Sequence, residues 1–194
     1  LASLFNVYGR EQRERAADFE AIGEWVVDIA AGYCRAEAYL ERSLALAAQY
    51  GDQWLIMRGR FELALTFFLS RSRSDERVSV LLNQVWENAT HLDEKLLQGY
   101  VQEARGEIAE RRGAHDVAAR HFGEAALLIA QRRGREPQRF FDRLGDRLLD
   151  ATLSHEAIRT LARGILTVIE TSAAIETSES LQSLQMLCQH VLDL

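Results

Sequence analysis

The chain has 194 residues, of which 47% are hydrophobic and 27% charged, a composition that supports a packed core and excludes global disorder. Its formal net charge of −6 argues against direct nucleic-acid binding, because proteins with that function usually present a basic face. No apolar run approaches the roughly 20 residues that span a bilayer, and Cys34 and Cys188 follow no metal-binding or redox spacing. We therefore expect a reduced, cytoplasmic protein that binds neither nucleic acid nor a membrane.

Apolar residues recur every three or four positions along the chain, which predicts an all-α protein. The predicted helices span residues 11–31, 33–50, 53–71, 75–90, 93–112, 115–133, 137–151, 155–173 and 178–193. Their ends are expected at residues that can take a left-handed conformation or accept an amide hydrogen bond, namely Gly51, Gly113, Gly134, Ser74 or Asp75, and Ser154. The only proline, Pro137, fits a first helical turn. Short connections then imply antiparallel hairpins, the units of an α-solenoid.

One hairpin carries a spaced set of small and aromatic residues. Gly106, Gly113, Ala118, Phe122 and Ala125 stand at relative offsets 0, 7, 12, 16 and 19. Small residues let two helices approach closely, and an aromatic side chain between them fills the remaining space. This spacing resembles the tetratricopeptide repeat (TPR), in which small, small, alanine, aromatic and alanine residues recur at these positions.

Two further stretches place residues at the last three of these offsets: Ala36, Leu40 and Ser43, and Val78, Leu82 and Val85. The anchors Ala36, Val78 and Ala118 are 42 and 40 residues apart, more than the usual spacing of about 34. They resemble the longer-helix variant found in bacterial regulators. The middle repeat is bulky at the small positions, and no repeat has the consensus tryptophan. The resemblance covers about residues 11–134.

The resemblance implies a TPR-like α-α superhelix in residues 1–151, with about three and a half repeats and a helical extension over residues 152–194. At the end of the superhelix, the stretch "FFDRLGDRLLDATL" (residues 140–153) is interpreted as a capping helix with one apolar and one charged face. Its apolar face would carry Phe140, Phe141, Leu144 and Leu148. Its charged face would carry Arg139, Asp142, Arg143, Asp146 and Arg147.

Two amphipathic helices are predicted after this cap. Their apolar positions are Leu161, Ile165, Leu166, Val168 and Ile169 in the first, and Leu181, Leu184, Leu187, Val191 and Leu192 in the second. The pair resembles the helical lead-in to a GAF domain in multidomain bacterial signalling proteins. The same residues also fit a fourth hairpin that completes the solenoid, or a homodimer formed through the leucine stripe from Leu181 to Leu192. The chain begins at Leu1, and a helical pattern continues to its last residues. We therefore expect a fragment of a longer protein.

Catalytic and metal-binding patterns are not found in the sequence. It contains no phosphate-binding or dinucleotide-binding glycine motif and no nucleophile elbow, so we expect no enzyme activity, cofactor or metal site. His115 and His121 are six residues apart, which places them about 120° from a shared helix face, and we expect both to be exposed. Glu107 and Glu110 are interpreted as solvated surface charge rather than as an acid–base pair. Arginine clusters at predicted turns are also interpreted as solvated, at residues 71–77 and 131–139.

A groove lined by the first helix of each repeat is the candidate binding site that the resemblance implies. Its candidate residues are Trp25, Asp28, Arg60, Phe67, Arg71, Tyr100, Glu103, Glu107 and Glu110. Aromatic and arginine side chains often anchor interfaces, although Trp25 and Phe67 are equally compatible with the core. The acidic third repeat favours a basic partner segment.

We expect a protein–protein interaction or regulatory module of a larger bacterial signalling protein, such as a kinase or transcription regulator with a downstream GAF sensor. It would bind a peptide or helix in the groove and pass the change along residues 157–171. One alternative is a small-ligand or signalling-peptide sensor with a pocket around Trp25, Trp54 and Phe67. Another is an oligomerisation scaffold.

Overall fold

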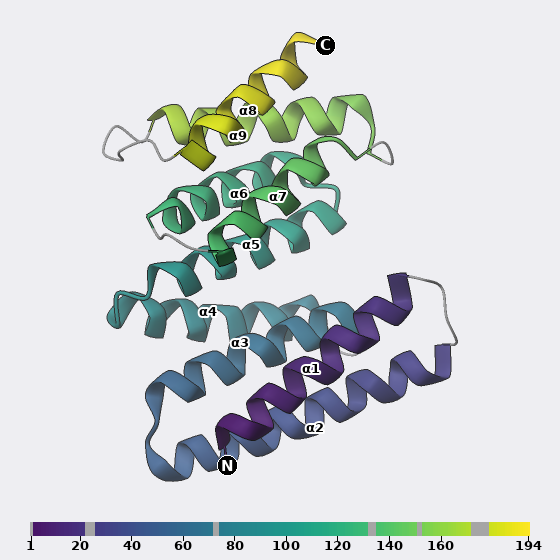
Figure 1. Cartoon of the computed structure of the whole chain (residues 1–194), viewed down its shortest axis with the longest axis vertical. Coiled ribbons are helices and arrows are strands. Elements are labelled where there is room, and N and C mark those ends of the chain that lie inside the picture. The colour runs from purple at the N-terminus through teal and green to yellow at the C-terminus, as the bar shows by residue number, and fades with distance from the viewer. Residues whose placement is uncertain (1, 22–25, 72–73, 132–134, 151–152, 172–178) are drawn as a thin grey trace. The chain divides into compact units, whose positions relative to one another are not determined.

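A computed structural model describes residues 2–21, 26–71, 74–131, 135–150, 153–171 and 179–194. Within these residues the chain is all-α, as predicted, and has no strand. The helices are α1 (Ala2–Ala21), α2 (Val26–Tyr50), α3 (Gln53–Ser70), α4 (Asp75–His91), α5 (Lys95–Arg111), α6 (His115–Ala130), α7 (Arg135–Leu148), α8 (His155–Thr171) and α9 (Glu179–Asp193) (Figure 1). They form two compact units, unit 1 (Leu1–His91) and unit 2 (Leu92–Leu194). None of the described helices is both long enough and apolar enough to cross a membrane.

Unit 1 is built around α3. This helix packs against α1, α2 and α4, while α1 and α2 form a long hairpin (Figure 1). The surrounding helices leave α3 with ten buried residues, among them Phe61, Phe67 and Phe68 at 5%, 1% and 5% exposure. Its N-terminus is capped by Asp52, whose Oδ1 accepts a hydrogen bond from the Leu55 amide at 2.9 Å.

The predicted boundary between the first two helices is wrong. The sequence suggested a break at residue 32, but Gly32 lies inside α2 and is buried. A Cβ atom at Gly32 would lie 2.9 Å from the Ala16 Cβ of α1. The glycine therefore permits a close helix–helix contact and does not end a helix.

Unit 2 repeats a helical hairpin with a regular spacing. α5 and α7 begin at Lys95 and Arg135, and α6 and α8 begin at His115 and His155, so corresponding helices start 40 residues apart. α6 packs against both α5 and α8, while α7 and α9 run next to each other (Figure 1). The predicted first-turn position of Pro137 in α7 is confirmed.

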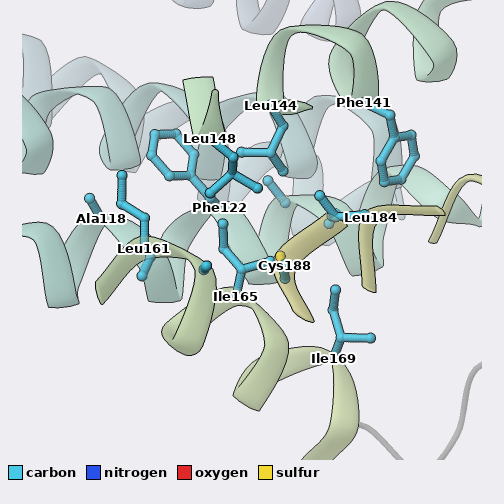
Figure 2. Packing of buried hydrophobic residues seen from close by; sticks show 14 of the residues in the cluster. Ala118, Phe122, Phe141, Leu144, Leu148, Leu161, Ile165, Ile169, Leu184 and Cys188 are labelled. Atoms are coloured by element: carbon cyan, nitrogen blue, oxygen red, sulfur yellow. The ribbon is translucent and has the colours of Figure 1, made fainter. Parts of the chain in front are cut away.

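One hydrophobic cluster joins α6, α7, α8 and α9 (Figure 2). Leu161, Ile165 and Cys188 have no exposed surface, and Phe122 is 1% exposed. The predicted apolar face of α7 is confirmed, because all four of its residues are buried: Phe140, Phe141, Leu144 and Leu148. Leu181 and Leu184 of the α9 stripe are 1% and 4% exposed. These two leucines therefore lie within this core, whereas Leu187 and Leu192 of the same stripe are half-buried against it.

The recurring positions of the sequence pattern are all buried. The nine residues at these positions are 0–1% exposed: Ala36, Leu40, Ser43, Val78, Leu82, Val85, Ala118, Phe122 and Ala125. Three of the predicted helix ends are also confirmed. Gly51 and Gly113 have φ values of 67° and 73°, and the Ser154 hydroxyl accepts a hydrogen bond from the Ala157 amide at 3.2 Å. Gly134 lies outside the described residues.

Candidate functional site

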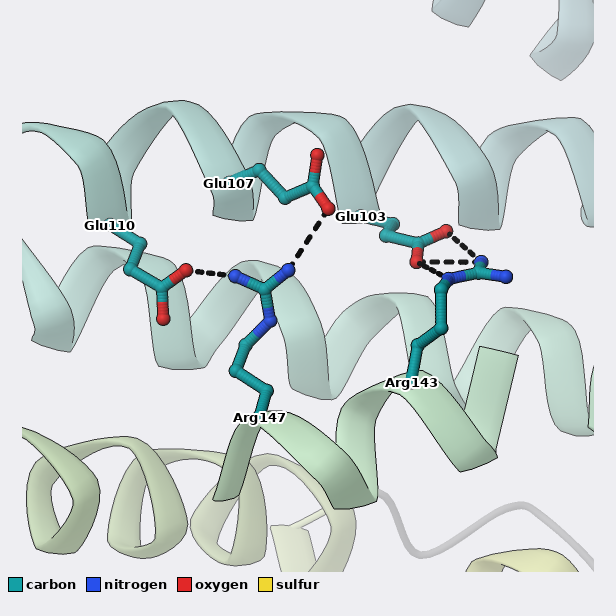
Figure 3. Close-up of polar contacts among 5 residues, drawn as sticks. All are labelled: Glu103, Glu107, Glu110, Arg143 and Arg147. Carbon is teal, nitrogen blue, oxygen red and sulfur yellow. Dashed lines mark hydrogen bonds and ion pairs between the residues drawn. The ribbon is translucent and has the colours of Figure 1, made fainter. Parts of the chain in front are cut away.

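An acidic row lies on α5 and faces an arginine row on α7. The acidic row consists of Glu103, Glu107 and Glu110, and the arginine row of Arg143 and Arg147 (Figure 3). Residues four apart on a helix share a face. Glu103 and Glu107 have this spacing on α5, as do the two arginines on α7. The helices therefore present matching rows of opposite charge.

The contacts between the rows are ion pairs with specific geometry. Arg143 binds Glu103 with two nitrogens: Nη2 lies 2.7 and 2.9 Å from the two carboxylate oxygens, and Nε lies 3.0 Å from Oε1. Arg147 donates from Nη2 to Glu107 Oε1 at 3.0 Å and from Nη1 to Glu110. The partners Glu103 and Arg143 are 40 residues apart, as are Glu107 and Arg147. The same order of contacts along both helices means that α5 and α7 run parallel.

Phe122 of α6 connects this site to the hairpin pattern. The Arg147 guanidinium carbon lies 4.9 Å from the centre of the Phe122 ring, a distance that permits a cation–π contact. On α5, a Cβ atom at Gly106 would lie 2.6 Å from a carbon of the same ring. The predicted close approach of α5 and α6 at this glycine is therefore confirmed. The Phe122 ring therefore lies between the backbone of α5 at Gly106 and the guanidinium group of Arg147 in α7.

Burial raises the pKa of Glu103 and Glu107 in the acidic row. The side chains of Glu103, Glu107 and Glu110 are 14%, 28% and 14% exposed. Loss of hydration raises the pKa of Glu103, and the opposing effect of Arg143 is smaller. The pKa of Glu107 is raised by burial and by the neighbouring Glu103, against the opposing effect of Arg147. The interpretation of Glu107 and Glu110 as solvated charge is therefore wrong, because both are largely covered and share Arg147.

A second polar group joins α5 to α6 through Gln102, which is 5% exposed. Gln102 donates to Glu124 and accepts a hydrogen bond from Arg105 Nη1 at 3.3 Å, and its Oε1 lies 3.0 Å from His121 Nδ1. Burial, and then Arg105 and Arg120, lower the pKa of His121, which favours the neutral ring. The prediction of two exposed histidines is wrong, since His121 and His115 are both half-buried.

The remaining groove candidates have different environments. Phe67 is 1% exposed beneath the Arg77 guanidinium, whose carbon lies 5.6 Å from the ring centre, and so it belongs to the core, the alternative that the sequence left open. Arg60 is half-buried, and Arg71 is exposed at the C-cap of α3 with a φ of 53°. Tyr100 is half-buried against the cluster of unit 2. The structure does not describe Trp25 or the side chain of Asp28.

The aromatic pocket considered for a ligand sensor also involves Trp25, Trp54 and Phe67. Trp54 is 54% exposed, whereas Phe67 is buried. Phe67 therefore belongs to the core, and because Trp25 lies outside the described residues the pocket stays a prediction.

Sequence reasoning missed a buried acid in unit 1. Glu62 of α3 is 1% exposed and lies 2.7 Å from Arg13 Nη2 of α1 and 3.2 Å from Arg58 Nη2. Its position in the apolar stretch "RFELALTFF" was the available signal, because a lone acid in such a stretch needs a partner when it is buried. α1 and α3 are thus joined by an arginine–glutamate pair, as α5 and α7 are.

Metal-binding groups and known relatives are two further sources of evidence on function. Within the described ranges, no three His, Cys, Asp or Glu residues are grouped so that they could hold a metal ion. Comparison of the chain with models of protein families, with curated proteins and with solved structures gives no significant match.

Proposed function

We propose that this chain is a TPR-like interaction module of a larger bacterial signalling protein, such as a kinase or a transcription regulator. Its acidic row recognises helices that carry arginines four residues apart. The observation that carries this proposal is the engagement of Glu103 and Glu107 by Arg143 and Arg147. This contact supports a partner helix that carries arginines at the same spacing.

The regularity of the hairpins supports the TPR-like interpretation. Corresponding helices of unit 2 begin 40 residues apart, and the ion pairs keep the same separation. Gly106 and Phe122 make the small-on-aromatic contact expected between the two helices of such a repeat. In this interpretation α8 and α9 pass a signal to a downstream domain, for which a GAF sensor is our candidate.

Helix α7 acts in this proposal as an internal occupant of the acidic row. A partner helix with the same arginine spacing competes for the same carboxylates. The apolar face of α7 is buried, so an arginine pair alone does not displace the helix. The partner must therefore also present an apolar face, and its binding alters the contacts that α7 makes with α9.

Charge exchange between the rows tests this recognition. The variant Arg143→Glu/Arg147→Glu places like charges opposite the acidic row and loosens α7. A labelled peptide of residues 138–150 should then bind to the variant, with affinity measured by fluorescence anisotropy. The same peptide with alanine at both arginine positions should bind at least about tenfold more weakly, a loss of about 1.4 kcal/mol.

A charge-swapped chain is the matched control. Adding Glu103→Arg, Glu107→Arg and Glu110→Arg to the variant restores opposite charges between α5 and α7. This chain should no longer bind the arginine peptide, and hydrogen exchange in α7 should return to its slow rate. Equal binding of the arginine and alanine peptides would show that the acidic row does not select its partner by charge, and the proposal would fail.

A further inference from the structure

A cleft of about 380 Å³ lies between α7 and α9. Its apolar wall is formed by Phe141, Leu184 and Leu187. Phe141 and Leu184 lie on the same side of the buried cluster (Figure 2). Small-molecule sites usually have volumes of roughly 300–1,000 Å³ and mostly apolar walls. The cleft therefore has the size of a site for a compact organic molecule, and its lining is about half polar and half apolar.

The polar residues of the cleft carry negative charge. Asp142 of α7 and Glu179 of α9 both line it and are exposed, and none of its described lining residues is a lysine or an arginine. Gln138 donates to Asp142 Oδ1 at 2.9 Å and accepts from the Ser180 hydroxyl at 3.4 Å, which links the two helices at the polar edge. An apolar wall beside two carboxylates suits a molecule with an apolar body and a positive charge.

Gly145 shows that the side chains of the described residues leave this space unfilled. A Cβ atom at Gly145 would meet only Leu187 Cδ2, at 3.6 Å. At every other glycine that the structure describes within a helix, a Cβ atom would lie closer than 3.0 Å to an atom of a neighbouring helix. Glycine within a helix costs about 1 kcal/mol relative to alanine. At Gly145 this cost is not explained by a close helix–helix contact, and the bare backbone borders the cleft.

We propose that the cleft between α7 and α9 binds a small organic cation. Its apolar body lies against Phe141, Leu184 and Leu187, and its ammonium or guanidinium group lies near Asp142 and Glu179. This site lies on a face of α7 other than that of the arginine row, and the observations that carry it are separate from those that carry the function proposed above. It gives the chain a sensory input in addition to a partner surface.

Phenethylamine is a suitable probe because it joins an aromatic ring to an ammonium group. Titrated into the ¹⁵N-labelled full chain, it should shift the amide resonances of Gly145 and Ser183 with a Kd of about 0.1–1 mM, as expected for so small a ligand. Phenylacetate, with a similar body and the opposite charge, should leave them unchanged. If phenylacetate binds as tightly, the carboxylates do not select the ligand and the proposal is overturned.

Two substitutions at one position provide the structural test. Gly145→Leu fills the cleft and should weaken phenethylamine binding at least about tenfold, whereas Gly145→Ala adds a single methyl group and should change it less than about twofold. Both variants gain helix propensity, so both should remain folded. Asp142→Asn/Glu179→Gln should also weaken binding about tenfold. Equal binding by the leucine and alanine variants would place the ligand elsewhere and overturn the proposal.

One further titration tests whether the cleft binds a free small molecule or a side chain of a peptide. A tetrapeptide with adjacent phenylalanine and lysine residues presents the same ring and ammonium group on a chain. Binding of phenethylamine without binding of the tetrapeptide supports a small-molecule site. Binding of the tetrapeptide alone would overturn the small-molecule assignment.

Discussion

The Arg147 guanidinium lies over the Phe122 ring, 4.9 Å from its centre, while its nitrogens bind Glu107 and Glu110. One side chain of α7 thus contacts the aromatic residue of the hairpin and two carboxylates of α5. Arginine suits this position because its planar group can stack on a ring and donate to several carboxylate oxygens at once. The contact makes the position of α7 depend on charge as well as on apolar packing.

The first prediction concerns the pH dependence of stability. Burial raises the pKa of Glu103 and Glu107 above their ordinary value of 4.5, so the folded chain binds their protons more tightly than the unfolded chain does. Their contribution to the free energy of unfolding therefore falls as the pH rises from about 4.5 through the raised pKa values. We expect Glu103→Gln/Glu107→Gln to stabilise the chain more at pH 7 than at pH 5.

Urea denaturation of the wild-type and variant chains at a series of pH values measures this difference. Comparing the two chains removes the effect of all other titrating groups. If the variant loses stability relative to the wild type as the pH rises, the ion pairs outweigh the cost of burial. The predicted direction of the pH dependence is then wrong.

The second prediction concerns Gly106. Gly106→Ala places a Cβ atom 2.6 Å from a Phe122 ring carbon, so the ring or the helices must move. We expect a destabilisation of about 1–3 kcal/mol from this overpacking, despite the higher helix propensity of alanine. Thermal or urea denaturation measures it. In a double-mutant cycle, the same substitution should cost much less in a Phe122→Leu background. An equal cost in both backgrounds would contradict the contact.

The third prediction concerns the buried acid of unit 1. Glu62→Ala removes the close carboxylate partner of Arg13, whose side chain is 12% exposed, and leaves it only the Glu14 carboxylate at 3.8 Å. Breaking a buried ion pair in this way costs about 3–5 kcal/mol. The matched control is Glu11→Ala, which removes the exposed partner of Arg15 in α1 and should change stability little. Similar denaturation midpoints for the two variants would rule out a structural role for Glu62.

The fourth prediction concerns the two thiols. Cys34 is exposed, whereas Cys188 has no exposed surface and its pKa is raised to about 12 by burial. At pH 8, a thiol reagent such as Ellman's reagent should label Cys34 rapidly and Cys188 only when α9 separates from the core. In a Cys34→Ser chain, the labelling rate should therefore report the opening of unit 2. Rapid reaction of both thiols would contradict the packing of α9.

Local chemistry made most helix boundaries predictable. A glycine with positive φ ends a helix at Gly51 and Gly113, and a capping hydroxyl starts one after Ser154, without reference to distant residues. The predicted break at residue 32 is wrong because Gly32 contacts Ala16, which belongs to a different helix. Glycine can therefore end a helix or permit a close contact between two helices. Which of the two it does depends on the residues that pack against it in the folded chain.

The candidate site was predictable in its chemistry but not in its partner. The acidic residues of α5 favoured a basic segment, and that preference follows from charge alone. The charged face of α7 was interpreted as that of a capping helix, yet Arg143 and Arg147 bind Glu103 and Glu107. The pairing depends on the parallel packing of α5 and α7. The available signal was that both pairs repeat at a separation of 40 residues.

The helical glycines have a consequence for the evolutionary history of this chain. Each of seven glycines would place a Cβ atom closer than 3.0 Å to one residue of a neighbouring helix: Gly9 to Leu40, Gly32 to Ala16, Gly59 to Leu44, Gly99 to Ile129, Gly106 to Phe122, Gly123 to Val168 and Gly164 to Ala119. A larger residue at one member of a pair requires a smaller one at the other. Homologues should therefore show these positions changing in pairs. Such coupled substitutions would identify distant relatives in which the individual residues have diverged.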